Sequence, residues 1–392
     1  MNSPNEEEFV GLSAPGASKP TNFQRNPFIR FRERLDSYAP VCDGEMTDEQ
    51  WVDIVSSLDA SISDIEGHGF VETPVLEAPE LAAAAGLDID LWIKAEPHNV
   101  GGSHKARHLM GVAIQMLVSE ALGAPRTERL AIASCGNAAM GAGVVAAAMQ
   151  RPLDVFVPTW ADQSIVSRLA DLSASVHPSE RRDGEVGDPA YLRFREAVED
   201  GARAFSVQGT DTPTTFDGGR TLGWELADQL PDIDALYIQV GGGALSTAVS
   251  MAIPNARLHP VQAEGCAPLR RAWDLLAPDY DFDAAEAEPE KYMWAWDDPQ
   301  SFATGILDDI TYDWLPLLRR THETGGEPIV APETLIVSAY EMAHQHTEIP
   351  VCSTGSAGLA GLMAAPPKRA STDGPERVAV LFTGIDRSQE NV

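Results

Sequence analysis

Short apolar runs that end in small-residue turns recur along the chain, and the first two are followed by stretches suited to helices. The runs at 131–133, 235–238 and 378–382 are typical of buried strands, and 246–253 is typical of a helix. Strands that alternate with helices in this way favour a parallel α/β architecture.

Lys105 follows a Gly-Gly-Ser turn and precedes an apolar stretch with helical spacing, so it lies near a predicted helix N-terminus. The positive end of a helix disfavours an added cation, which lowers the pKa of the amine and favours attack on an aldehyde. A surface lysine that caps a loop is the alternative, and it is favoured while this lysine is considered alone.

A glycine turn follows the apolar run at 235–238, with the sequence Gly241-Gly242-Gly243-Ala244-Leu245. Glycines let the backbone approach an anion, and the next helix offers free N–H groups, so this turn is a candidate phosphate site. It lacks the Lys-Ser/Thr ending of a nucleotide loop and GxGxxG spacing, which disfavours nucleotide binding. A tight strand-to-helix connection without a ligand is the alternative.

Two further segments carry polar groups at strand ends. The turn Ser134-Cys135-Gly136-Asn137 can present a hydroxyl and backbone amides to a carboxylate. An asparagine that merely suits a turn is the alternative. The last apolar run ends in the hydroxyl of Thr383, which by itself indicates only a buried strand.

In this order, the four segments resemble the fold-type II family of pyridoxal-phosphate enzymes, which includes threonine synthase, threonine and serine dehydratases, cysteine synthase and the tryptophan synthase β chain. The resemblance implies an α/β fold of two domains, each an open, mainly parallel sheet flanked by helices. Residues 26–97 and 208–392 would form the large cofactor-binding domain, and 98–207 the small substrate-side domain. Pyridoxal 5′-phosphate would lie in the cleft between them.

The resemblance also assigns roles. Lys105 would form the aldimine with the cofactor, the glycine turn would hold its phosphate, and Thr383 would bond its pyridine nitrogen. The predicted site comprises catalytic Lys105; cofactor-binding Lys105, Asn137, Gly241, Gly242, Gly243, Ala244, Leu245 and Thr383; and substrate-binding Ser134, Cys135, Gly136 and Asn137. Two features depart from the family pattern: Ala138 replaces the histidine of many dehydratases, and Ile385-Asp386-Arg387 replaces the usual ending of threonine synthases.

A hydroxyl cannot keep the pyridine nitrogen protonated as a carboxylate would, so elimination across the α,β bond is favoured over transamination. We therefore expect an enzyme that acts on a β- or γ-substituted amino acid, either as an ammonia-lyase or as a synthase resembling threonine synthase. A non-catalytic member of the fold that binds the cofactor or a partner is the alternative. Arg220 is a further candidate for an anionic group, although bracing a loop is the more frequent role of such an arginine.

Composition limits the other possibilities. A net charge of −31 argues against nucleic acid and anionic membranes as partners. Four isolated cysteines and nine histidines without metal spacing predict reduced thiols and no metal site. No apolar run is long enough to span a membrane, so we expect a cytoplasmic protein, and residues 1–25 are expected to form a mobile arm. The family suggests a homodimer.

Between 280 and 301, the chain is acidic and also contains aromatic residues. This mixture predicts a surface segment whose aromatic side chains pack back on the protein, or a lid over the site.

Overall fold

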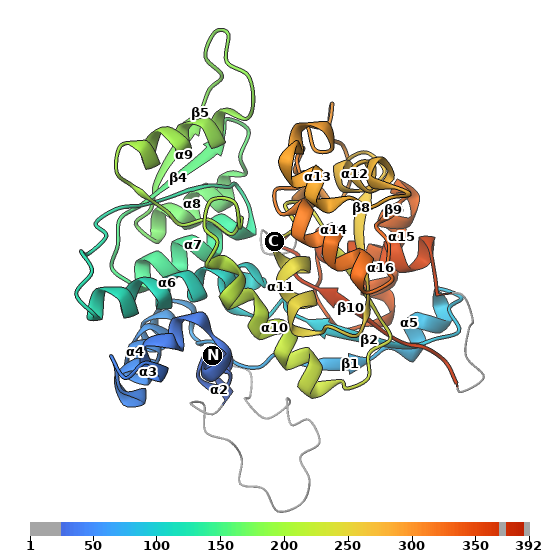
Figure 1. Ribbon diagram of the computed structural model, residues 1–392, viewed down its shortest axis with the longest axis horizontal. Helices are drawn as coiled ribbons and strands as arrows, with labels where there is room; N and C mark the ends of the chain where they lie inside the picture. Colours follow the sequence, from blue (N-terminus) through green and yellow to red (C-terminus); the bar gives the residue numbers. More distant parts are fainter. Residues whose placement is uncertain (1–24, 368–373, 388–392) are drawn as a thin grey trace, which may run out of the picture.

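The computed structural model describes residues 25–367 and 374–387, so the predicted N-terminal arm lies outside the described residues except for its last position. Helices and strands alternate along the chain, and they form two lobes (Figure 1). The strands are β1 (Val75–Glu77), β2 (Asp90–Ala95), β3 (Leu130–Ala133), β4 (Leu153–Pro158), β5 (Ser175–Ser179), β6 (Arg203–Ala204), β7 (Ala235–Gln239), β8 (Arg257–Ala263), β9 (Ile329–Ala331) and β10 (Arg377–Phe382). The longer helices are α4 (Asp48–Glu66), α6 (Lys105–Ala121), α7 (Asn137–Ala148), α8 (Gln163–Asp171), α9 (Pro189–Glu199), α10 (Thr215–Gln229), α11 (Ala244–Ala252), α12 (Pro268–Leu276), α14 (Trp314–Glu323), α15 (Glu333–His346) and α16 (Ser353–Ala364). Short helical turns are α2 (Pro27–Arg30), η1 (Arg32–Arg34), η2 (Asp36–Tyr38), α3 (Ala39–Cys42), α5 (Pro79–Ala84), η3 (Val100–Gly102), α13 (Phe282–Ala287), η4 (Pro289–Lys291) and η5 (Thr304–Ile306).

The strands form two sheets, which confirms the predicted architecture. The larger sheet has the order β1-β2-β10-β7-β8-β9, and only β1 is antiparallel to its neighbour. The smaller sheet has the order β5-β4-β3-β6 and is parallel throughout. Helices cover both faces of the larger sheet: Val378, Val380 and Phe382 of β10 pack in one buried cluster with α16, while Ala379 and Leu381 pack in another with α11. Burial on both faces explains why this strand reads as a continuous apolar run.

Helices α2 to α4 do not form a separate core. Phe28, Trp51 and Val55 belong to the same buried cluster as Leu109 of α6 and Val144 of α7. Figure 1 shows these N-terminal helices beneath the lobe that carries the smaller sheet. The N-terminal helices therefore pack against α6 and α7. The division of the chain at residues 97 and 207 remains a prediction.

The acidic segment between 280 and 301 packs back on the larger lobe. The ring of Tyr292 stacks on Trp314 with centroids 6.2 Å apart. The guanidinium of Arg271 lies 3.8 Å from the ring centroid of Trp294 and 5.3 Å from that of Trp296. These cation–π contacts hold the aromatic side chains against α12.

Candidate functional site

The site lies where adjacent parallel strands end. Thr383 directly follows β10, and the glycine turn follows its neighbour β7 after Val240. Because the carboxyl ends of parallel strands meet at one edge of the sheet, both groups lie at the edge where such folds bind ligands. The predicted strands and turns therefore come together in space.

Lys105 is the first residue of α6, as its sequence position predicts. The preceding turn is fixed on the end of β10, because His104 N donates to Thr383 O (3.2 Å) and Ser103 bridges to Gly384. Burial lowers the pKa of the Lys105 amine, although the carboxylates of Asp308 and Asp313 partly offset this effect. The lysine thus gains neutral-amine character, as a nucleophile or base requires.

Two buried imidazoles accompany this lysine. The rings of His104 and His108 meet edge to face with centroids 5.9 Å apart. Burial lowers the pKa of His108 to about 3, and burial holds that of His104 well below its usual range, with the Lys105 cation adding to both effects. Both imidazoles are therefore neutral at physiological pH and add no charge beside the amine.

The glycine turn has the properties of an anion site. Gly243 has φ +104°, a left-handed conformation that favours glycine, and it precedes α11. Burial raises the pKa of the Asp308 carboxyl beside this turn, and the Gly242 N–H opposes that shift, as an amide that faces an oxyanion does. The Ser246 hydroxyl in the first turn of α11 is fully buried and has no hydrogen-bond partner among the described residues. An orphaned donor beside free helix amides fits a phosphate group.

The Thr383 side chain is oriented by a neighbour that the sequence analysis did not single out. Gln239, the last residue of β7, donates from Nε2 to Thr383 Oγ1 at 2.6 Å, and both side chains are buried. Because the threonine oxygen accepts this bond, its own hydrogen remains available for an acceptor. This donor fits an unprotonated pyridine nitrogen, which agrees with the predicted role of Thr383.

The predicted substrate loop lies between β3 and α7. Ser134 N donates to Phe156 O (3.1 Å), which anchors the loop to β4, and Ser134 Oγ accepts weakly from Gly136 N (3.4 Å). Burial raises the pKa of the Cys135 thiol, with the nearby carboxylates of Asp188 and Asp308 adding to it, so this cysteine is not an activated nucleophile. Asn137 begins α7, where free amides favour a carboxylate.

Two carboxyls on the segment before α14 also face the site, and no spacing in the sequence signalled them. Asp308 Oδ2 lies 2.5 Å from the position of a Cβ on Gly241, and Asp313 Cβ lies 3.2 Å from one on Gly243. Burial raises the pKa of Asp308 to about 6 and that of Asp313 to about 7, although the Lys105 cation opposes both shifts. Because these two side chains lie so close to the turn, Gly241 and Gly243 have no room for larger side chains.

A buried network of charges supports the start of α6. Arg107 donates to Glu96 (Nε–Oε2, 2.8 Å) and to Glu225 of α10 (Nη1–Oε1, 2.6 Å). Lys94 Nζ of β2 lies 2.7 Å from Glu225 Oε2, and all four side chains are essentially fully buried. Although burial opposes it, the two glutamates raise the pKa of Arg107. Two cations thus balance two carboxylates in the interior beside the first turn of α6, to which Arg107 belongs.

The pair of acidic side chains near the glycine turn predicts a pH dependence. Asp308 and Asp313 have pKa values of about 6 and about 7 in the folded protein, above the ordinary 3.8. A raised folded pKa contributes stability below the unfolded pKa, and this contribution is lost as the pH rises through the folded value. We expect the cofactor-free protein to lose stability between about pH 4 and about pH 7, on the order of 2 kcal/mol for each carboxyl.

Urea unfolding at about pH 5 and about pH 8 measures this difference. The double variant Asp308→Asn with Asp313→Asn should show a clearly smaller difference than the unchanged protein. Asp283→Asn is the matched control, because that carboxyl is exposed and only pairs with Arg319 (3.1 Å). Equal pH slopes in the double variant and the unchanged protein would contradict the assignment.

Other candidate groups have structural partners. Arg220 pairs with Asp217 (2.6 Å) and Asp36 (2.9 Å), which supports the loop-bracing alternative.

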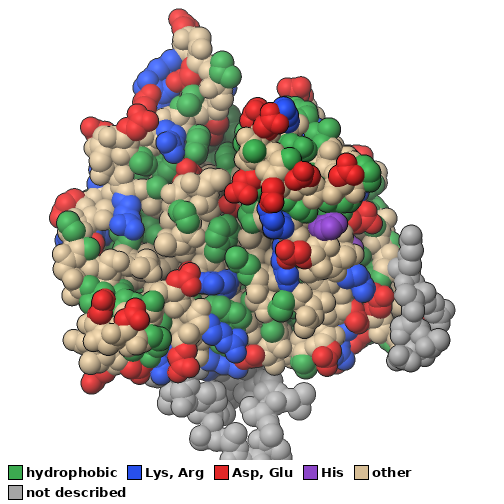
Figure 2. Space-filling model, viewed as in Figure 1, with side chains coloured by type: hydrophobic (Ala, Val, Ile, Leu, Met, Phe, Trp, Pro, Cys, Tyr) green, Lys and Arg blue, Asp and Glu red, His purple; other side chains and the backbone are tan. Residues whose placement is uncertain are grey.

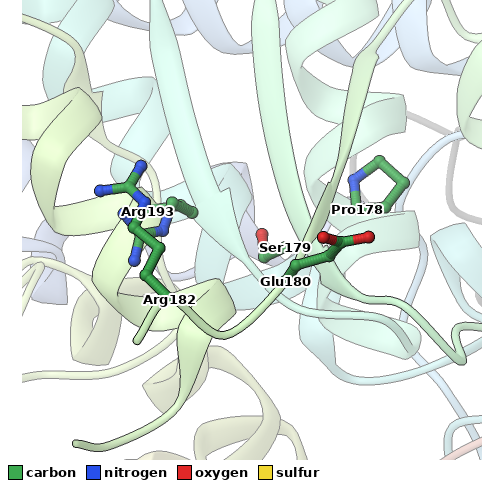
Figure 3. A pocket seen from close by; sticks show the side chains of 5 residues that line it. All are labelled: Pro178, Ser179, Glu180, Arg182 and Arg193. Carbon is green, nitrogen blue, oxygen red and sulfur yellow. The ribbon is translucent and has the colours of Figure 1, made fainter. Parts of the chain in front are cut away.

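A hollow of about 380 Å³ lies on the smaller lobe (Figure 3). It is lined by Pro178, Ser179, Glu180, Arg182 and Arg193, and the charges of both arginines are already paired with Glu196. In residues 25–367 and 374–387, no group of three or more His, Cys, Asp or Glu side chains is placed to hold a metal ion. On the face that Figure 2 shows, carboxylates are scattered over both lobes rather than gathered in one patch.

The comparisons with known proteins agree with this geometry. The family model described as pyridoxal-phosphate dependent enzyme matches residues 68–384. An L-threonine ammonia-lyase of Thermotoga maritima is 29% identical over 182 residues, or 45% of this chain and 42% of that protein. A serine racemase of Oryza sativa subsp. indica is 22% identical over 321 residues, or 80% of this chain and 85% of that protein. The chain spans about half the length of the threonine ammonia-lyases and dehydratases first matched.

Solved structures share the fold. Threonine deaminase isoform 2 of Solanum lycopersicum has a TM-score of 0.64 at 20% identity and covers 88% of this chain and 92% of its own. Within the described residues, no helix is both long and apolar enough to cross a membrane.

Proposed function

The chain belongs to the pyridoxal-phosphate dependent enzyme family, and on this basis we propose that it is a lyase that eliminates a β or γ substituent from an L-amino acid. The observation that carries the proposal is the hydrogen bond from Gln239 to Thr383, which leaves a hydroxyl donor at the strand end. A neutral partner for the pyridine nitrogen favours elimination over transamination. The ammonia-lyases among the relatives support the same reaction class.

When bound, pyridoxal phosphate supplies an aldehyde that links to amines and an electron-poor ring that accepts an electron pair. The backbone amides of Gly242 to Leu245 and the Ser246 hydroxyl would hold its phosphate, and Thr383 would donate to its ring nitrogen. The Asn137 amide would donate to its phenolic oxygen. Each of these groups lies directly after a strand or in the helix that follows it: Thr383 follows β10, the glycine turn and α11 follow β7, and α7 follows β3.

The reaction then depends on Lys105. Its amine, with a pKa lowered by burial, would take the proton from the substrate α carbon and return it at a later step. The Ser134 hydroxyl and the first amides of α7 would orient the substrate carboxylate, so that the α C–H bond faces the amine. The imidazoles of His104 and His108 are neutral, so they add no second positive charge beside this amine.

A threonine synthase-like replacement is the second candidate within the same reaction class, since it shares the elimination step. It would need cationic groups for a phosphorylated substrate, yet Arg107 is fully buried among glutamates and Arg168 pairs with Glu66 (3.0 Å). These pairings favour the lyase. A homodimeric, cytoplasmic enzyme is part of the proposal, since the family suggests the dimer.

A substrate screen tests the proposal. The loaded protein is mixed with L-serine, L-threonine and a phosphorylated homoserine, and ammonia, keto acid and phosphate are measured separately. We expect ammonia and keto acid in equal amounts from at least one unphosphorylated substrate. Release of phosphate alone would support the synthase, whereas no product and no spectral change with any amino acid would support a non-catalytic binding protein.

A further inference from the structure

The segment after β10 reaches across to the smaller lobe. Ile385 N donates to Gly102 O (2.8 Å) and Asp386 N to Pro350 O (2.8 Å), so the backbone here is held on both sides. From this strand end, Arg387 Nη1 donates to Asn137 Oδ1 at 2.5 Å and Nη2 to Gly101 O at 2.8 Å. One guanidinium therefore connects the N-terminus of α7 with the turn that precedes Lys105.

This contact fixes which way the asparagine amide faces. A guanidinium has five N–H donors and no acceptor, so the atom that meets Arg387 must be the amide oxygen. The Asn137 Nδ2 group then points to the other side, where a Cβ on Gly384 would lie 2.8 Å from it. Gly384 directly follows Thr383, so the amide donor is turned toward the strand end that carries the hydroxyl.

We propose that Arg387 is a positioning residue that holds the Asn137 amide with its N–H group toward the phenolic oxygen of the cofactor. The inference rests on the proposed function, because it assumes that the cofactor binds at this site. The arginine also polarises the amide, since hydrogen bonds in a chain strengthen one another. A stronger donor and a nearby cation both stabilise negative charge on the phenolic oxygen.

The test is the pH titration of the visible absorbance band of the cofactor-loaded protein without substrate. Positive charge near the phenolic oxygen favours the less protonated form of the chromophore, so its loss raises the titration midpoint. We expect Arg387→Ala to raise the midpoint by about half to one pH unit. Arg387→Lys keeps the charge and should recover part of the shift, whereas Arg387→Gln should not.

A double-variant cycle separates positioning from a general loss of stability. If Arg387 acts through the amide, Arg387→Ala should shift the midpoint clearly less in an Asn137→Ala background than in the unchanged protein, because only the direct effect of its charge would remain. Arg319→Ala is the matched control, because that arginine forms exposed pairs with Asp283 (3.1 Å) and Glu286 (3.9 Å) and lies over the ring of Phe282. A midpoint in Arg387→Ala equal to that of the unchanged protein, or shifts that add in the double variant, would overturn the inference.

The failure of the inference can be told from the failure of the proposed function. If the unchanged protein shows no visible band with pyridoxal phosphate, the cofactor site itself is wrong. If the band is present and depends on Lys105 but does not respond to Arg387, only the positioning role fails. Should Arg387→Ala not fold, the comparison of Arg387→Lys with Arg387→Gln still decides between the outcomes.

Discussion

Replacing Lys105 with alanine is expected to abolish the visible absorbance of the loaded protein and to lower turnover at least about 1,000-fold. The lysine supplies the only group at the start of α6 that can both link to an aldehyde and accept a proton. The loss should appear in kcat, because the amine acts in the transition state rather than in ground-state binding alone. Absorbance spectra and single-turnover product assays measure the two effects separately.

Lys291→Ala serves as the control, since that side chain is exposed and pairs with Glu288 (2.5 Å). Its spectrum and turnover should equal those of the unchanged protein. Retention of the yellow colour together with unchanged turnover in Lys105→Ala would refute the assignment. Retained colour with lost turnover would instead mean that another amine holds the cofactor.

Replacing Arg107 with methionine should destabilise the protein by about 3 to 5 kcal/mol, because it leaves buried carboxylates without a balancing cation. Only Lys94 would remain opposite Glu96 and Glu225, and its ammonium donates to Glu225 (2.7 Å), to Thr73 O (2.7 Å) and to Gln229 (3.0 Å). Chemical denaturation of the cofactor-free protein measures this loss without any contribution from ligand binding.

The same change in an exposed pair provides the reference. Arg182 Nη1 lies 2.8 Å from Glu196 Oε1 on the surface, so Arg182→Met should change stability by less than about 1 kcal/mol. If Arg107→Met were no more destabilising than Arg182→Met, the buried network would not support α6. A double variant of Arg107→Met and Glu96→Gln should recover part of the loss, since it removes the charge that lost its cation and leaves Lys94 paired with Glu225 (2.7 Å).

The strands and turns of the site could be predicted from the sequence because each combines a local signal with a local cause. An apolar run such as 378–382 is buried on both faces, and Gly243 adopts a positive φ that other residues disfavour. Their order along the chain then identified the family, which supplied the role of Lys105. None of these strands and turns had to be predicted from a contact between distant segments of the chain.

The residues that were missed depend on such contacts. Asp308 and Asp313 lie in an irregular segment, and only the fold shows that they reach the glycine turn. Arg387 was recognised as a departure from the family pattern, but its partner Asn137 lies 250 positions earlier in the chain. Gln239 offered one usable signal, since a polar side chain at the end of a buried apolar strand needs a partner.

The order of strands in the larger sheet also has a consequence for synthesis. β10 is the last of the described strands along the chain, yet it lies between β2 and β7 in the sheet. On a ribosome, the early strand β2 and the later group β7 to β9 therefore have exposed edges until β10 arrives. The candidate site, which includes Thr383 directly after β10, can therefore form only after β10 has joined the strands made before it.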